Sequence, residues 1–370
     1  MNFAYSEEQQ QLADSLRKAL ADHWRFAQRR KRSANTGHNR DAWNLLADIG
    51  VSGLLVPELY GGFGESVETM TVVHIELGRS LVSEPVIPSA VMATALLSAA
   101  DNQSINQLLM PRLAAGHEVI ALAYLEPGQQ NILRPEMSRA SRCASGYTLT
   151  AEKKLVWGGN CADHFIVSAL LDGTPALFLV SADSRNLTLQ DFPTMDGYRL
   201  ASLKLEQQQL DESALIAVGK RAEDAMQTAV DYGITAVCAQ ASGAMSRLIA
   251  ITIDYLKTRK QFGRPLADFQ ILQHRLADMV IQQEIALSMA YVATRALRER
   301  DIDERKRLLS SAKLAVADAG RFIGQNAVQL HGGMGMTDEL EVGDYFKRLI
   351  CVDHILGNSD FHIDRLDALF

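Results

Sequence analysis

The feature that most constrains the fold is a long helical stretch that opens the last third of the chain. Residues 222–258 read as one helix, which at about 1.5 Å per residue is on the order of 50 Å long. Its centre is rich in small residues, among them Ala239, Gly243 and Ala244. Two further long helices are predicted at 267–300 and 306–330. Long helices with short connections predict an antiparallel bundle, in which the small residues allow neighbouring helices to approach closely.

Between residues 118 and 216 the pattern changes to short β-rich runs separated by turn residues. The predicted strands are Val119–Leu125, Tyr147–Thr150, His164–Leu170, Ala176–Val180, Leu187–Leu189 and Leu200–Leu205. Short strands without long helices between them predict an antiparallel sheet or barrel-like domain rather than a doubly wound one.

The first third of the chain reads as helices again. Ser6 and Gln9 form a capping box, and leucines at 12, 16 and 20 give one buried helix face. Further helices are predicted around 41–49, 66–80 and 89–100. The fold class is therefore mainly α with a central β domain: an N-terminal helical domain over 1–117, an antiparallel β domain over 118–216 and a C-terminal helical bundle over 217–370.

Composition excludes several classes of protein. The net charge of -7 argues against nucleic acid as a partner. The one basic run, Arg29–Arg32, is interpreted as a solvated helix end. The four cysteines, 143, 161, 238 and 351, show neither metal-ligand spacing nor a disulfide pattern, so no metal site is expected. No stretch reads as a signal peptide or membrane span, and we expect a cytoplasmic protein with no membrane partner.

Two motifs in the bundle could contact a ligand. The stretch from Tyr255 to Gln270 places Arg259 at a helix end, followed by a corner containing glycine and proline. The second, Gln329-Leu-His-Gly332-Gly333, follows a long helix. Each motif alone is consistent with an ordinary helix corner or cap, although the glycines would also let backbone N–H groups approach a ligand closely.

Together the two motifs are far more specific. With Phe269-Gln270 and the early Tyr60-Gly-Gly-Phe-Gly64, they resemble the acyl-CoA dehydrogenase family in order and spacing, over essentially the whole chain. The resemblance implies FAD as cofactor, an acyl-CoA thioester as substrate and an electron-transferring flavoprotein as electron acceptor. It also implies at least a dimer, because part of the FAD site comes from a neighbouring subunit.

The resemblance assigns cofactor contacts residue by residue. Arg259 matches the arginine that meets the FAD pyrophosphate, for which a guanidinium fork is well suited. Trp157 matches a position beside the flavin but could equally be a core residue. The full set of matched residues is Arg259, Gln270, Gln329, Gly332, Gly333, Leu125 and Trp157.

The catalytic base of the family has no counterpart. Dehydrogenation needs a carboxylate to remove an α-proton, and the family places a glutamate at one of two positions, which here are Leu356 and Gly233. The nearby carboxylates are weak candidates for the base: Asp231, which lies about 200° around the helix from Gly233, and Asp353 and Asp360, which flank Leu356.

The thioester side of the pattern is also altered. The run that holds the CoA arm in the family appears as residues 125–132 without its serine, and Ile234 stands where an arginine is common. Two hypotheses follow: an enzyme in its own right with an unusual base, or a partner subunit that completes an FAD site while a related chain supplies the base. The sequence resembles the smaller, base-lacking subunits of bacterial heteromeric acyl-CoA dehydrogenases, and we favour the second. The acyl group cannot be deduced.

Overall fold

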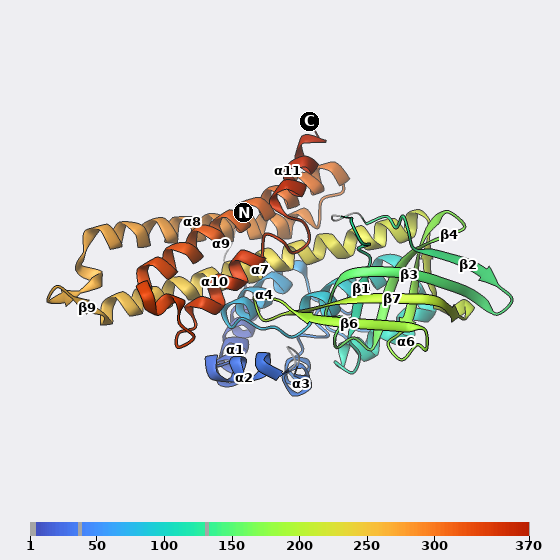
Figure 1. Ribbon diagram of the computed structural model, residues 1–370, viewed down its shortest axis with the longest axis horizontal. Helices are drawn as coiled ribbons and strands as arrows, with labels where there is room; N and C mark the ends of the chain where they lie inside the picture. The colour runs from blue at the N-terminus through green and yellow to red at the C-terminus, as the bar shows by residue number, and fades with distance from the viewer. Residues whose placement is uncertain (1–4, 36–38, 130–132, 370) are drawn as a thin grey trace.

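The computed structural model describes residues 5–35, 39–129 and 133–369. One helix, α7 (Lys220–Thr258), runs along most of the long axis of the molecule. The β domain surrounds its N-terminal end, and the short β9–β10 turn (Lys260–Gln261 and Arg264–Pro265) lies beyond its C-terminal end (Figure 1). The predicted fold class, mainly α with a central β domain, is confirmed.

The C-terminal bundle has the predicted long helices. α8 (Gln270–Ala296) and α9 (Ile302–His331) pack beside α7, and α10 (Val342–Cys351) and α11 (Ser359–Asp367) pack against α9. The small residues in the centre of α7 do allow close approach: a Cβ on Gly243 would lie 1.9 Å from the carbonyl oxygen of Ile75 on α4 (Val67–Arg79). A Cβ on Gly78 of α4 would likewise lie 1.9 Å from the carbonyl oxygen of Gln240 on α7. The two glycines therefore allow α4 and α7 to pack this closely.

The N-terminal helices pack under the middle of α7 (Figure 1). The capping box at the start of the first helix is present: the Gln9 N–H donates to Ser6 Oγ and the Ser6 N–H to Gln9 Oε1. The remaining helices are α1 (Glu7–His23), α2 (Phe26–Asn35), α3 (Arg40–Asp48), a π-helical segment (Val86–Ala93) that leads into α5 (Thr94–Ala100), and α6 (Gln103–Ala114).

The interpretation of the basic run as a solvated helix end was wrong for its first two residues. Arg29 is only 9% exposed and forms ion pairs with Glu341 (2.9 Å) and Asp344 (3.6 Å), and Arg30 pairs with Asp338 (2.8 Å). These contacts connect α2 to the segment that begins α10, two parts of the chain that are about 310 residues apart in sequence. The run therefore joins the first and last helical regions.

The β domain is an eight-stranded sheet in the order β6-β7-β3-β2-β4-β5-β8, with β1 paired to β4. Most neighbours are antiparallel as expected, but β1 and β2 both pair with β4 in parallel. The strands are β1 (Ile120–Ala123), β2 (Arg139–Cys143), β3 (Gly146–Trp157), β4 (His164–Leu171), β5 (Thr174–Ser181), β6 (Leu187–Pro193), β7 (Arg199–Leu210) and β8 (Leu215–Val218).

Helix α7 is long and apolar enough to cross a membrane by length and composition alone. However, 78% of its most apolar window is buried within the protein, against α4, α8 and α9. Its apolar character is therefore accounted for by the core of the bundle.

Candidate functional site

A cavity of about 370 Å³, which we call the inner cavity, lies where the β domain meets the bundle. Leu125 and Trp157, both predicted beside the flavin, line it. Trp157 packs edge-to-face on Tyr198, with ring centroids 5.2 Å apart. The wall is mostly apolar and aromatic; its other described members include Pro88, Met92, Leu122, Tyr124, Leu155, Leu200, Cys351, Ile355 and Leu356. Such a wall suits a flat aromatic ligand.

Tyr198 is held in place from behind by a buried arginine. The guanidinium of Arg348 lies 3.9 Å from the centroid of the Tyr198 ring, donates to its hydroxyl (2.9 Å) and forms an ion pair with Asp196 (3.3 Å). Burial raises the pKa of Tyr198 to about 12, so the phenol stays protonated at neutral pH. This cluster fixes one side of the inner cavity.

The two positions that lack the family's glutamate, Gly233 and Leu356, contact each other beside the inner cavity. A Cβ built on Gly233 of α7 would lie 2.7 Å from Cδ1 of Leu356 and 2.9 Å from Sδ of Met92. Leu356 adopts a positive φ of 58°, a left-handed conformation that costs a leucine about 1–2 kcal/mol. Surrounding contacts must therefore hold the loop in place.

Those contacts come from two buried side chains beneath the loop. Lys313 on α9, 1% exposed, donates to the carbonyl oxygens of Gly357 (2.9 Å) and Asp353 (3.2 Å). His362 on α11, fully buried, donates from Nε2 to the Leu356 carbonyl (3.2 Å) and accepts at Nδ1 from Ser310. Burial lowers the pKa of Lys313 to about 8 and that of His362 to about 3, so the histidine is neutral.

The candidate bases have other partners or point to solvent. Asp231 is 2% exposed and pairs with Arg305 of α9 (3.1 Å) while Gln227 donates to its second oxygen (2.7 Å). Burial raises the pKa of Asp231. Asp231 is not among the residues that line the inner cavity.

The two carboxylates near Leu356 do not line the inner cavity either. Asp353 accepts hydrogen bonds from the N–H (3.1 Å) and Oγ (2.6 Å) of Ser359 and pairs with Arg321 (3.2 Å). It therefore joins the start of the loop after α10 to the first residue of α11. Asp360 is exposed in the first turn of α11. The structure thus brings none of the three candidates to the inner cavity.

Two further cavities adjoin the inner one in a row, each sharing lining residues with the next. The middle cavity, about 430 Å³, shares Tyr124 and Leu356 with the inner cavity. The entrance cavity, about 440 Å³, shares Leu133, Gln227 and Lys306 with the middle one.

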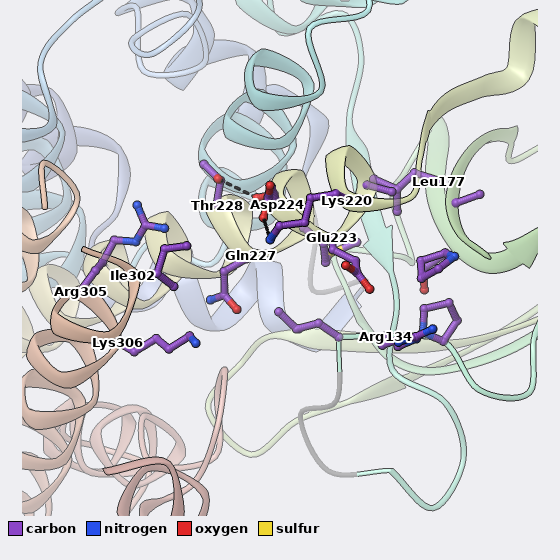
Figure 2. A pocket seen from close by; sticks show the side chains of 17 residues that line it. Arg134, Leu177, Lys220, Glu223, Asp224, Gln227, Thr228, Ile302, Arg305 and Lys306 are labelled. Carbon is purple, nitrogen blue, oxygen red and sulfur yellow. Dashed lines mark hydrogen bonds and ion pairs between the residues drawn. The ribbon is translucent and has the colours of Figure 1, made fainter. Parts of the chain in front are cut away.

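Cations gather at the entrance. Figure 2 shows Arg305 and Lys306 of α9 on one side of the entrance cavity, Arg134 on the other, and Gln227 and Glu223 of α7 between them. Lys220 also lines it, and Arg365 lines the middle cavity. The entrance cavity therefore carries four cations beside the carboxylates of Glu223 and Asp224, whereas the inner cavity combines aromatic and aliphatic side chains with polar ones such as Asp196.

The loop that borders the entrance is held by a residue that the sequence analysis did not select. The buried carboxylate of Glu126 accepts the N–H groups of residues 136, 137 and 138 at 2.7–2.8 Å and the Nζ of Lys153 at 3.0 Å. Burial opposes its ionisation, but these hydrogen bonds outweigh burial and lower its pKa to about 2. Glu126 belongs to the altered thioester-side run, whose last residues, 130–132, lie outside the described part of the chain.

The remaining predicted cofactor contacts form an exposed corner at the far end of the bundle. Arg259 caps the C-terminal end of α7, and Gln270 begins α8. Gln329, Gly332 and Gly333 lie at the end of α9 and are also exposed. Tyr255 joins the two motifs, since its ring stacks on that of His331 with centroids 4.3 Å apart. We call the five predicted contacts, Arg259, Gln270, Gln329, Gly332 and Gly333, together with Tyr255 and His331, the distal corner.

The distal corner has open hydrogen-bonding capacity that fits a phosphate-bearing ligand. Among the described residues the guanidinium of Arg259 has no hydrogen-bond or ion-pair partner. Gly332 has φ +57°, and a Cβ on Gly332 or Gly333 would meet nothing within 4 Å, so a ligand can approach this backbone. His331 Nδ1 donates to Ala327 (2.8 Å), which leaves Nε2 as a buried acceptor without a partner among the described residues. In the sequence, the histidine that directly precedes the two glycines was the feature that could have pointed to this unpaired nitrogen.

The chain does not bring the distal corner and the inner cavity together. Gly233, which contacts Leu356 in the wall of the inner cavity, and Thr258, next to Arg259, are separated by about 25 residues of one continuous helix, or about 38 Å. Figure 1 shows α7 extending from the β domain to the β9–β10 turn.

Comparison with known proteins identifies the family. The profile "Acyl-CoA dehydrogenase, N-terminal domain" matches residues 6–117, and "Acyl-CoA dehydrogenase, C-terminal domain" matches residues 223–368. The chain is 29% identical over 348 residues to the acyl-CoA dehydrogenase IpdE2 of Mycobacterium tuberculosis, covering 92% of this chain and 91% of that protein.

Solved structures agree in fold. A chain of the ChsE4–ChsE5 complex from Mycobacterium tuberculosis superposes with a TM-score of 0.89 at 24% identity, covering 100% of this chain and 98% of that one. A variant of the Tcur3481–Tcur3483 steroid ACAD gives a TM-score of 0.87 at 28% identity, with 98% and 97% covered. The protein is a member of the acyl-CoA dehydrogenase family, whose members are flavin oxidoreductases that use FAD.

Proposed function

We propose that this chain is one subunit of a heteromeric, FAD-dependent acyl-CoA dehydrogenase. In this assembly its distal corner contacts the FAD of a neighbouring, related chain, and that chain supplies the catalytic base. FAD, when bound, supplies the acceptor for the hydride that leaves the β-carbon of the acyl group. The single observation that carries the proposal is the contact between the two empty base sites, Gly233 on α7 and Leu356 in the wall of the inner cavity.

The geometry of the cofactor contacts supports a shared site. Leu125 and Trp157 line the same cavity as Leu356, which contacts Gly233 about 38 Å back along α7 from the helix end beside Arg259. We take this separation to be too great for one FAD molecule to touch both groups within a single chain. If both groups contact flavin, they contact different FAD molecules. The distal corner then serves a cofactor held mainly by another subunit, to which Arg259 would offer a guanidinium for the pyrophosphate.

The missing base supports the heteromeric form of that assembly. Asp231, Asp353 and Asp360 are engaged elsewhere or exposed, and none lines the inner cavity. We therefore expect the Asn variant at each of these positions to keep turnover in the active assembly, measured with an acyl-CoA substrate. A loss of about a hundredfold in any one of them would identify that residue as the base and support an enzyme that works alone.

The row of cavities supports an acyl-CoA as the ligand. Arg305, Lys306 and Arg134 at the entrance suit the phosphates of CoA, because cations stabilise phosphate through charge-assisted hydrogen bonds. The middle cavity is lined partly by Val230, Phe361 and Leu369, which suits an apolar acyl group. The relatives' names include a steroid ACAD, but the acyl group of this chain's ligand is not assigned. An electron-transferring flavoprotein as acceptor stays a prediction, as do the domain boundaries and the cytoplasmic location.

The cofactor role of the distal corner can be tested on the purified assembly. Arg259→Ala should weaken FAD retention during gel filtration, with the released cofactor identified by chromatography as FAD. Lys257→Ala, an exposed cation on the last turn of the same helix, is the matched control and should retain flavin normally. Equal retention in the two variants, or a cofactor other than FAD, would contradict the proposal.

A further inference from the structure

We infer that Asp231 is a positioning residue for CoA recognition: from behind the wall of the entrance cavity, its buried carboxylate holds Arg305 and Gln227 in place for the ligand. The inference rests on the proposed function, because it takes the entrance cavity as the site of the CoA phosphates. It assigns a binding role to a carboxylate that does not line the inner cavity.

Asp231 contacts two residues of the entrance wall without lining the cavity itself. Its Oδ2 lies 3.1 Å from Nε of Arg305, and its Oδ1 accepts a hydrogen bond from Nε2 of Gln227 (2.7 Å). Arg305 and Gln227 line the entrance cavity (Figure 2), whereas Asp231 is 2% exposed and lines neither the entrance nor the middle cavity. Both oxygens of the carboxylate are therefore used to hold wall residues from behind.

Burial makes this arrangement difficult to break. A buried carboxylate without partners is strongly disfavoured; burial raises the pKa of Asp231, while Gln227 and Arg305 oppose that rise. Release of Arg305 would leave the carboxylate buried with Gln227 alone. By contrast, the neighbouring Lys306 pairs with Asp303, whose side chain is 71% exposed, and an exposed ion pair fixes geometry only weakly. Arg305 is therefore held more firmly than Lys306.

The contact at Nε leaves other donors of Arg305 available. A guanidinium has five N–H groups in a planar fork. Besides the ion pair with Asp231, Nη1 makes one long hydrogen bond to the carbonyl oxygen of Glu299 (3.4 Å), and Nη2 has no partner among the described residues. The terminal nitrogens can therefore bind a phosphate of CoA while Nε stays against Asp231.

Charge alone predicts the opposite effect of Asp231 on CoA. A negative charge near a phosphate repels it, so removal of the carboxylate charge would strengthen CoA binding if Asp231 had no positioning role. If Asp231 positions Arg305, removal of its charge weakens binding instead. The sign of the change therefore separates the two cases.

Asp231→Asn in the assembly containing the full chain provides the test. Hydrogen-exchange mass spectrometry measures how CoA protects the peptide around residues 302–308, which gives a Kd for this chain's site alone because the partner's peptides differ in mass. We expect the Kd for free CoA to rise by about tenfold. An unchanged or lower Kd would overturn the inference and leave the proposed function standing.

Glu304→Gln is the matched control. Glu304 is the residue before Arg305 on α9, pairs with Arg307, and lines neither the entrance nor the middle cavity. Its variant removes the same charge close to Arg305 without removing a contact to that residue. It should not weaken CoA binding, and a loss equal to that of Asp231→Asn would contradict the inference.

A double-mutant cycle tests whether Asp231 acts through Arg305. Asp231→Asn should add no further loss of CoA affinity in an Arg305→Ala background, whereas a combined loss of about a hundredfold would show independent effects and contradict the inference. Arg305→Lys tests the same point in a chain that keeps Asp231. A single ammonium drawn towards Asp231 has no second set of donors for phosphate, so its Kd should match that of Arg305→Ala. Wild-type affinity in Arg305→Lys would overturn the inference.

Turnover distinguishes this role from catalysis. Asp231→Asn should raise KM for the acyl-CoA substrate by about tenfold and leave kcat unchanged at saturating substrate. A fall in kcat of about a hundredfold would mark Asp231 as the base and overturn both the inference and the proposed function. If CoA protects no peptide of this chain, the inference fails together with the CoA-binding part of the proposed function.

Discussion

Gly233 and Leu356 touch where α7 meets the loop after α10, with 2.7 Å between Leu356 Cδ1 and the position of a Cβ on Gly233. In an acyl-CoA dehydrogenase, either position is where the resemblance places a catalytic glutamate. Here they form a packed apolar contact beside Met92. The loss of the base is therefore part of the packing of the site and has consequences for stability that can be measured.

We predict that the effect of Gly233→Ala on stability depends on the residue at 356. Replacing glycine by alanine inside a helix normally stabilises by about 0.5–1 kcal/mol. Here overpacking against Leu356 should reverse that gain and lower the free energy of unfolding by about 1 kcal/mol. In a Leu356→Ala background only the overlap with Met92 (2.9 Å to Sδ) remains, so the same change should cost less than it does in the wild type. Urea unfolding of the four proteins measures both values, and stabilisation in both backgrounds would show that the contact is not tight.

We predict a pH signature for the buried lysine under the loop. Burial lowers the pKa of Lys313 from 10.5 to about 8. Between these pH values the unfolded chain binds more protons than the folded chain, so the folded state gains stability as pH rises. The free energy of unfolding of the wild type minus that of Lys313→Met should therefore increase from about pH 8 to about pH 10.5. A difference that stays constant or falls across this window would refute the assignment.

We predict that the entrance cations recognise CoA. Arg305→Ala and Lys306→Ala should each raise the Kd for free CoA by about tenfold, the loss expected for one charge-assisted hydrogen bond, and the effect should diminish at high salt. Arg305, Lys306 and Arg307 each have a carboxylate partner. Arg307, the next residue on α9, does not line the entrance cavity, so Arg307→Ala is the control. If Arg307→Ala weakens CoA binding as much as the two variants do, a general electrostatic attraction accounts for the effect. Recognition of CoA by the entrance cavity would then be contradicted.

Local signals made most of the fold predictable. The capping box at Ser6, the small residues of α7 and the short β-rich runs separated by turn residues are properties of short windows, and each was confirmed. Helix α6 was missed, and it contains Pro111 near its end. Strand β2 was missed because it is largely exposed and polar, Arg139–Cys143, and lacks an apolar alternation. The ion pairs of Arg29 were missed because their partners lie about 310 residues away.

The candidate site was predictable only in parts. The sequence placed Leu125 and Trp157 beside one cavity, and the cofactor role of all seven residues stays a prediction. Three-dimensional packing alone reveals that Gly233 meets Leu356, that Asp231 faces Arg305, and that about 38 Å of helix separates Gly233 from the end of α7 beside Arg259. These relationships depend on how helices pack, which no short sequence window contains.

The central claim is that this chain completes a flavin site in a different, related chain. Native mass spectrometry of the chain, purified alone and after co-expression with a homologue that retains the glutamate, tests it most directly when combined with flavin content and acyl-CoA turnover. We predict that the chain alone holds well under one FAD per chain and shows little turnover, whereas the mixed oligomer holds FAD and is active. A homotetramer with one FAD per chain and normal turnover on a simple acyl-CoA would contradict the account.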